Sequence, residues 1–256
     1  MEFNAFTFIF LFAILTSVLA LLWLNFRQDK AIKRSFNEVP DGFKETITLE
    51  DHQKAGNYTK AKLLVNHFEI IFSTFIVLVW TIGGAMNWLD VFWSQRISNP
   101  ILMGTTFIVS IMLIASFIDL PFSIYRNFVL EQKFGFNRMT VKTFTADLIK
   151  EILLTLILMI PLIYAILYLM NISSIGDYWW IYVWVIISLF TLTMMWIYPS
   201  FIAPIFNKFN PLDNETLKSR INNLLERTGF GSDGIFVMDG SKRSSHGNAY
   251  FTGIGK

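Results

Sequence analysis

The sequence contains no cysteine, and this absence excludes several kinds of chemistry. Without thiols the chain forms no disulfide, holds no cysteine-ligated zinc and has no cysteine nucleophile. Charge is also scarce, since only 16% of the residues are Asp, Glu, Lys or Arg. The net charge of +2 is small, and the lysines and arginines are spread over several segments without forming a basic stripe. Nucleic acid is therefore not expected as a partner.

Apolar side chains are abundant: 54% of the residues are hydrophobic, 16% are aromatic, and the mean hydropathy is +0.49. This composition is too apolar for an ordinary soluble domain. Five uncharged runs are each long enough to cross a hydrocarbon layer, which takes about 20 helical residues. They are Phe3 to Leu24, Ile70 to Leu89, Ile97 to Ile118, Ile152 to Met170 and Tyr178 to Tyr198. The sequence predicts an α-helical polytopic membrane protein with five transmembrane helices in a lipid bilayer.

The first apolar run is interpreted as a retained anchor and not as a signal peptide. No positive charge precedes it, and the run continues without a break to Leu24. Gly83 and Gly84 in the second run and Pro161 in the fourth are expected to weaken or kink those helices.

The lysines and arginines fall almost entirely on one side of the predicted spans. Residues 27–67 hold eight of them, 119–151 hold five and 199–256 hold seven, whereas the opposite side has only Arg96. By the positive-inside rule, the N-terminus faces outward and the C-terminal tail is cytoplasmic. We therefore predict a transmembrane domain over residues 1–198 with cytoplasmic loops 27–67 and 119–151.

Carboxylates near the ends of the predicted spans have simple explanations. Asp119 and Glu151 lie where water or Lys150 is within reach. Asp147 and Lys150 are three residues apart on a predicted helix start, so they are interpreted as a solvated ion pair.

Residues 199–256 predict the start of a small α+β unit. The apolar spacing indicates an amphipathic helix over Asp213 to Thr228, with Asp213 or Asn214 as its N-cap and Gly229 as its C-cap. The strand-forming run Ile235 to Met238 comes next. A unit of this size is too small to bury a core alone, so we expect it to be an incomplete cytoplasmic domain.

The last stretch, Asp239-Gly-Ser-Lys-Arg-Ser-Ser-His-Gly-Asn-Ala-Tyr-Phe-Thr-Gly-Ile-Gly-Lys256, predicts a loop followed by a strand over Asn248 to Thr252. A strand at a sheet edge binds an extended peptide through main-chain hydrogen bonds. Asn248, Ala249 and Tyr250 are the candidate substrate-binding residues: the Asn248 amide would fix the register, and the small Ala249 side chain would allow close approach. An ordinary structural strand explains the same residues and stays open.

This stretch resembles the segment upstream of the zinc-binding helix in the CAAX prenyl protease family of membrane-embedded zinc metalloproteases. Ile202-Ala-Pro-Ile-Phe-Asn-Lys-Phe-Asn-Pro-Leu212 and Phe134-Gly-Phe-Asn-Arg-Met-Thr140 are similar to further motifs of that family. The resemblance implies a bundle of membrane helices around a water-filled chamber. It also implies zinc-dependent cleavage near the C-terminus of a prenylated or otherwise membrane-delivered peptide or protein, in a bacterial cell membrane or the endoplasmic reticulum.

The sequence also departs from that family. Such a protease needs His-Glu-x-x-His on a helix, with two imidazoles on the metal and the glutamate as base. None of the three histidines, His52, His67 and His246, begins this pattern, so we assign no catalytic and no metal-binding residue. We expect the chain to be the front part of such a protease, ending before its metal site, and to be inactive and without zinc by itself.

Two alternatives from other classes stay open. One is a non-catalytic membrane protein, either a relic that binds extended peptides or a helper that completes its site with another chain. The other is a channel or transporter, and the absence of charged residues within the five apolar runs argues against this class.

Overall fold

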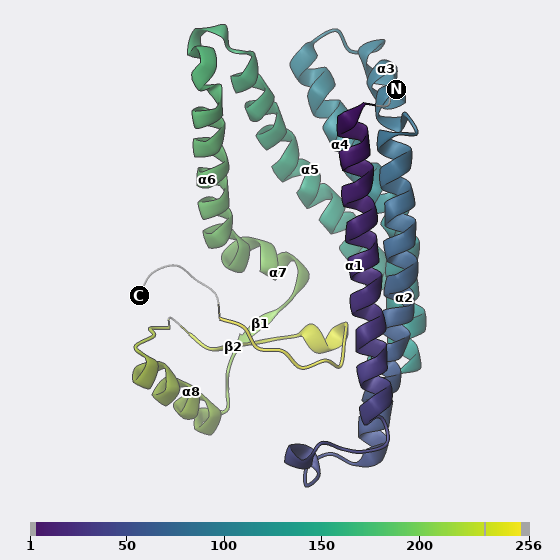
Figure 1. The fold of residues 1–256 in the computed structure, drawn as a ribbon. Coiled ribbons are helices and arrows are strands. Elements are labelled where there is room, and N and C mark those ends of the chain that lie inside the picture. The colour runs from purple at the N-terminus through teal and green to yellow at the C-terminus, as the bar shows by residue number, and fades with distance from the viewer. Residues whose placement is uncertain (1–3, 233, 252–256) are drawn as a thin grey trace. The chain divides into compact units, whose positions relative to one another are not determined.

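The computed structural model describes residues 4–232 and 234–251, and most of this part of the chain is helical (Figure 1). The α-helices are α1 (Ala5–Ser35), α2 (Leu49–Thr81), α3 (Ala85–Ser94), α4 (Pro100–Tyr125), α5 (Val141–Asn171), α6 (Trp179–Ile197), α7 (Ala203–Phe206) and α8 (Glu215–Thr228). The strands are β1 (Phe209–Pro211) and β2 (Phe236–Met238). Short 3-10 turns are η1 (Asp41–Phe43), η3 (Ser173–Tyr178) and η5 (Gly240–Lys242), and η2 (Arg126–Glu131) and η4 (Tyr198–Ile202) are π-helical.

Within the described residues, five helical segments are long and apolar enough to cross a membrane, which confirms the predicted class. They are Ala5–Ser35, Leu49–Thr81, Pro100–Glu131, Val141–Asn171 and Gly176–Phe206. Each overlaps one predicted apolar run, but the helices continue beyond the runs because polar residues extend the backbone hydrogen bonding past the hydrocarbon layer. Phe3, where the first predicted run begins, lies outside the described residues.

The second predicted run, Ile70 to Leu89, is wrong at its C-terminal end. Helix α2 ends at Thr81, and the separate helix α3 comes after it. Gly84 between them has a φ of 78°, a left-handed conformation that glycine adopts without strain. A Cβ atom at Gly83 would lie 2.6 Å from the carbonyl oxygen of Val79. The glycine pair therefore ends this helix and does not merely bend it.

Residues 27–67, predicted as a loop, are mostly helical. Helix α1 continues to Ser35 and α2 begins at Leu49, so the connection is reduced to residues 36–48, which include η1. The Thr48 hydroxyl caps α2 by accepting a hydrogen bond from the Asp51 N–H at 3.1 Å. Residues 119–151 likewise contain η2 and the first turns of α5. Lysine, arginine and glutamate are good helix formers, so high charge alone did not specify a loop.

The chain forms two compact units. One comprises residues 1–98 and 116–134, and the other comprises residues 99–115 and 135–256. Helix α4 contributes to both. This division does not test the predicted boundary between a transmembrane domain (1–198) and a cytoplasmic domain (199–256), which stays a prediction.

In the first unit, α1 and α2 form an antiparallel hairpin (Figure 1). The Asn66 side chain donates to the Asn25 carbonyl oxygen across the hairpin at 3.2 Å, and Asn25 is buried. Closer to the turn the helices approach tightly, since a Cβ atom at Gly56 would lie 3.2 Å from the Phe36 ring. These contacts fix which face of α1 is turned toward α2.

Ion pairs and hydrogen bonds join α2 to the last turns of the third span. Arg126 donates to Glu69 at 2.8 Å and to Asp119 at 3.4 Å. The Tyr58 hydroxyl donates to Glu131 at 2.5 Å. The span-end carboxylate Asp119 is thus paired with a cation from its own segment.

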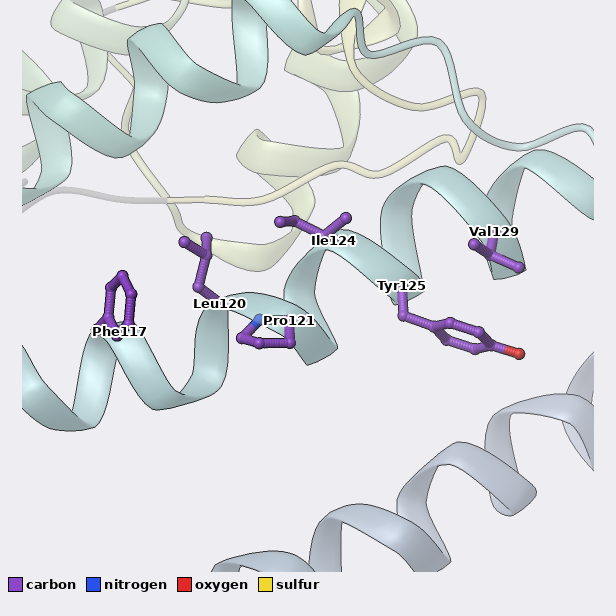
Figure 2. Close-up of a pocket in the computed structure, with 6 residues that line it drawn as sticks. All are labelled: Phe117, Leu120, Pro121, Ile124, Tyr125 and Val129. Atoms are coloured by element: carbon purple, nitrogen blue, oxygen red, sulfur yellow. The ribbon is translucent and has the colours of Figure 1, made fainter.

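An apolar pocket in the same unit is lined by side chains that project from α4 and η2 (Figure 2). The lining residues are Phe117, Leu120, Pro121, Ile124, Tyr125 and Val129. Specific ligand sites combine apolar walls with a few converging polar groups. This lining offers little besides the Tyr125 hydroxyl, so the pocket suits lipid or another apolar helix better than a reaction.

In the second unit, α5 and α6 pack together. Pro161, expected to weaken or kink its helix, lies inside α5, which continues to Asn171. Regular α6 ends at Ile197, just before Pro199, and π-helical η4 and the single turn α7 carry the helical path on to Phe206. The wider π turn accommodates a residue that has no N–H to donate.

The tail contains the predicted helix and, after it, the first predicted strand. The Asn214 side chain caps α8 by accepting from the Leu217 N–H at 2.9 Å, and Gly229 ends the helix with a φ of 72°. Strand β2, within the predicted run Ile235 to Met238, pairs antiparallel with β1, placing Phe209 opposite Met238. The predicted caps and strand are confirmed, and β1 is an additional strand.

Candidate functional site

The predicted strand over Asn248 to Thr252 is wrong for its described residues. Asn248 to Phe251 form no regular secondary structure, and Thr252 lies outside the described residues. Within the described part of the chain, no backbone–backbone hydrogen bond involves Asn248 to Phe251. Strand geometry requires a neighbour, and β2 is paired with β1 instead.

The candidate residues Asn248, Ala249 and Tyr250 are all exposed. The Asn248 side-chain oxygen accepts a hydrogen bond from the Ala249 N–H at 2.9 Å, so it is engaged locally. The Tyr250 hydroxyl lies 3.9 Å from the Met238 sulfur, and the Phe251 ring packs edge-on against Phe230 with centroids 5.5 Å apart. These few contacts hold the segment loosely and leave most of its main-chain groups accessible.

The residues just before this segment are held firmly. Ser244 and Asn137 form an antiparallel bridge, and the Arg138 N–H donates to the Arg243 carbonyl at 3.1 Å. The Ser245 N–H donates to the Phe136 carbonyl at 3.0 Å. Residues 136–138 and residues 243–245, which are far apart in the sequence, thus lie side by side.

His246 continues this contact. Its ring stacks on Phe136 with centroids 4.2 Å apart and planes inclined by 25°. The loop that precedes Asn248 is therefore anchored up to His246, and the accessible main chain begins directly after it.

Arg243 is the centre of the anchor. Its guanidinium forms two hydrogen bonds with Asp147 of α5, at 2.7 and 3.0 Å. It also donates to the Asn207 side chain at 2.8 Å and to the Phe206 carbonyl at 2.6 Å. Hydrogen bonding to Asp147 raises the pKa of Arg243 above its ordinary value, so the guanidinium stays charged. The interpretation of Asp147 and Lys150 as a solvated pair is wrong, because Asp147 binds Arg243.

Lys150 has a different role in the same cluster. Its ammonium donates to the Ile205 carbonyl at 2.9 Å. Together with Arg243, it satisfies carbonyl groups at the C-terminal end of α7, where cations are favourable. The three segments that carry the family resemblance, around residues 134–140, 202–212 and 239–251, meet around Arg243, through its guanidinium and its carbonyl group. Arg243 was missed by sequence reasoning, because in a loop rich in Ser, Lys and Gly it resembled a solvated charge.

Asp239 closes the turn after β2. Its carboxylate accepts the Lys208 N–H at 2.8 Å and pairs with the Lys242 ammonium at 2.5 Å. The Asp239 N–H in turn donates to the Lys208 carbonyl at 3.1 Å. The Lys242 pairing and the Lys208 N–H hold the pKa of Asp239 below its ordinary value.

The described residues do not fit a zinc ion. No group of three His, Cys, Asp or Glu side chains in residues 4–232 and 234–251 is placed to hold a metal. His52 contacts the Ser35 carbonyl at 2.7 Å and His67 contacts the Leu63 carbonyl at 2.7 Å, so each imidazole is hydrogen-bonded to a backbone carbonyl of a helix. A zinc site needs three or four converging ligands, and we derive no catalytic step from this part of the chain.

Comparisons with known proteins agree with this architecture. Residues 28–208 match a protein family described as CAAX prenyl protease N-terminal, five membrane helices. A Dictyostelium discoideum CAAX prenyl protease 1 homolog is 37% identical over 242 residues, covering 91% of this chain and 55% of that protein. The Saccharomyces cerevisiae CAAX prenyl protease 1 is 34% identical over 245 residues, covering 91% and 52%.

A solved structure shows the same fold. The crystal structure of S. mikatae Ste24p superposes with a TM-score of 0.80 at 33% identity, covering 94% of this chain and 56% of that chain. The chain spans about half the length of the curated relatives it matches.

Five membrane helices, together with a short segment of one helix and a two-stranded sheet tied to the fourth of them, define a multi-pass membrane protein. The match over residues 28–208 shows the family more narrowly: the chain belongs to the CAAX prenyl protease family.

Proposed function

We propose that the chain is the membrane portion and the start of the protease domain of a membrane endopeptidase of the CAAX prenyl protease type. Its substrates are polypeptides cleaved near their C-termini, prenylated or otherwise delivered by the membrane. The proposal draws on the family membership and on relatives named CAAX prenyl proteases.

One observation carries the role of this chain. Arg243 fastens the loop before Asn248 to α5, while the main chain of Asn248 to Phe251 is exposed and makes no backbone–backbone hydrogen bond with other described residues. The loop before Asn248 is anchored, and the main-chain donors and acceptors of the segment after it are available. This arrangement suits the addition of an extended peptide as a strand. Asn248 would then exchange its bond to the Ala249 N–H for one to the substrate backbone.

Asn248, Ala249 and Tyr250 thus bind and orient the substrate in our account. A substrate strand would supply the neighbour that this segment lacks, so the segment becomes a true strand only when occupied. Loose packing of Tyr250 and Phe251 against Met238 and Phe230 permits that adjustment.

Peptide hydrolysis itself would need the zinc that the family resemblance implies. The described residues offer no ligand set for it, so we place the metal and the activating base in a part of the complete protein beyond these residues. When bound, zinc supplies an activated water. The contribution derived for this chain is limited to holding the substrate.

The test compares the 256-residue chain with a complete protein carrying a His-Glu-x-x-His helix. Both are incubated with a farnesylated C-terminal peptide, and the products are identified by mass spectrometry, while zinc is measured by elemental analysis. We expect cleavage and one zinc per molecule only for the complete protein. One tightly held zinc, or peptide cleavage, in the shorter chain would overturn this assignment.

The orientation is also proposed. The excess of lysine and arginine in residues 27–67, 119–151 and 199–256 supports a cytoplasmic position for the candidate peptide site, with the N-terminus outward. On the cytoplasmic side, the candidate peptide site at Asn248 to Tyr250 would be accessible to the tail of a prenylated protein.

A further inference from the structure

The outer face of α1 carries three cations for which the described residues provide no salt bridge. Arg27, Lys30 and Arg34 come after Trp23 at spacings of four, seven and eleven residues, which places all four on one helix face. All four are exposed, with Trp23 at 55%. We call these four residues the basic face of α1, a local basic stripe that was not predicted from the sequence.

This face is turned away from α2. Asn25 is buried and bonded to Asn66, and Ile32 lies within 3.4 Å of where a Cβ atom at Gly56 would be, so these residues face α2. On a helix of 100° per residue, Arg27, Lys30 and Arg34 lie roughly opposite to them. The basic face is therefore open to whatever surrounds the hairpin.

Charge pairing separates these cations from their neighbours. Lys33, on a different face, is paired with Asp29 at 2.5 Å, and Lys44 at the turn is paired with Asp41 and Glu38. Within the described residues, no salt bridge involves Arg27, Lys30 or Arg34. The basic face thus has three cations free to bind an anion.

The position along the helix indicates which anion. The uncharged run ends at Leu24, and Trp23 is of the type enriched at membrane interfaces. With a rise of 1.5 Å per residue, Arg27 and Lys30 lie roughly 6 and 10 Å beyond Trp23, at the depth of lipid headgroups and their outer edge. Arg34 lies about 16 Å beyond it, where its long side chain reaches back toward the surface.

One contact prepares the arginine nearest the membrane. The Arg27 guanidinium lies over the Trp23 ring, 4.8 Å from the ring centroid. Such cation–π stacking orders the guanidinium and leaves its N–H edges available for phosphate oxygens. Tryptophan at the interface and arginine above it therefore form a preorganised pair.

We propose that the basic face of α1 binds the phosphate-bearing headgroups of anionic phospholipids, with Arg27 and Lys30 as the principal contacts. Three unpaired cations next to a membrane exit attract anionic lipid. The site is separate from the candidate peptide site and does not depend on proteolysis. Its chemistry alone does not tell a lipid headgroup from free phosphate, and its depth favours the lipid.

The test is native mass spectrometry of the full chain in detergent with equal amounts of phosphatidylglycerol and phosphatidylcholine. We expect phosphatidylglycerol to be retained at least about five-fold better, the effect of roughly one cation at an anionic surface. The variant R27Q/K30Q/R34Q should retain the two lipids about equally. The matched control K218Q/R220Q/R227Q, which removes three cations from α8, should keep the preference.

Other outcomes overturn the proposal. Equal retention of both lipids by the native chain, or an unchanged preference in R27Q/K30Q/R34Q, removes the site. Loss of the preference on adding inorganic phosphate, but not chloride of the same ionic strength, shows a free-anion site instead. If the triple variant fails to fold, the single variants R27Q and K30Q should each lower the preference for phosphatidylglycerol by a few fold, and R27K should keep it. An unchanged preference in both R27Q and K30Q would contradict the proposal.

Discussion

Arg243 and Asp147, which are 96 positions apart, form a two-point ion pair with Nε–Oδ2 and Nη2–Oδ1 distances of 2.7 and 3.0 Å. The two side chains are only 21% and 19% exposed, so water competes weakly for their charges. The pair ties the C-terminal tail to α5 and places the candidate peptide segment beyond a fixed point.

Replacing Arg243 with Gln should destabilise the tail, because Asp147 and the Phe206 carbonyl would lose their donors. The expected loss is about 1.5–3 kcal/mol, the range for hydrogen bonds to charged groups. R243K should recover only part of it, since an ammonium cannot make the two-point contact. Limited proteolysis of residues 239–251 and thermal unfolding in detergent measure the effect. The exposed Arg220 provides the control R220Q. If R220Q and R243Q showed the same proteolysis and the same melting temperature, Arg243 would not anchor the tail.

A larger residue at Gly104 should displace the Leu167 side chain, because a Cβ atom there would lie 2.9 Å from a methyl group of Leu167. G104V is expected to cost about 1–3 kcal/mol through overpacking between α4 and α5. L167A should relieve the clash, so the double variant should be less destabilised than the sum of the single ones. Melting temperatures of the four proteins check this, and strictly additive losses would contradict the contact.

The turn after β2 should be acid-sensitive through Asp239. Pairing with Lys242 and the Lys208 N–H lowers the pKa of Asp239 in the folded chain. Its stabilising contribution is therefore present above the ordinary aspartate pKa of about 3.9 and is lost as the pH falls through the lower folded value. Hydrogen exchange of residues 208 and 236–242, corrected for the intrinsic rate, should show more opening at acid pH. D239N should open more at neutral pH and lose most of this pH dependence.

The proposed orientation is testable because the chain has no cysteine to interfere. A single cysteine at Asp90 should react with a membrane-impermeant maleimide from outside the cell. Cysteines at Lys44 or Ser219 should react only after the membrane is permeabilised. The reverse pattern would place the candidate peptide site outside the cytoplasm.

The elements with strong local signals were predictable. The five apolar runs each reach about the length needed to cross a bilayer, and Asn214 and Gly229 are favoured residues at helix ends. The end of α2 at Thr81 could not be predicted from the sequence. Glycines are tolerated in membrane helices, and their φ values depend on the packing of the neighbouring helices.

The candidate site was predictable only in part. Asn248 to Tyr250 stood out by composition, but whether they pair depends on strand β1, which was not predicted and which takes β2 as its partner. The Arg243–Asp147 pair joins residues 96 positions apart, and no local pattern encodes so distant a contact. Lys150, three residues from Asp147, offered a plausible but wrong partner.

Photo-crosslinking in a complete protein of this family tests the central claim most directly. Benzoylphenylalanine replaces Tyr250, or the 65% exposed Tyr178 as a control, and a farnesylated C-terminal peptide is added. Our account predicts that the peptide is captured at position 250 and not at 178, and that R243Q lowers this capture while the protein stays folded. Equal capture at both positions, or none at 250, would contradict the assignment of Asn248 to Tyr250 as a peptide-binding segment.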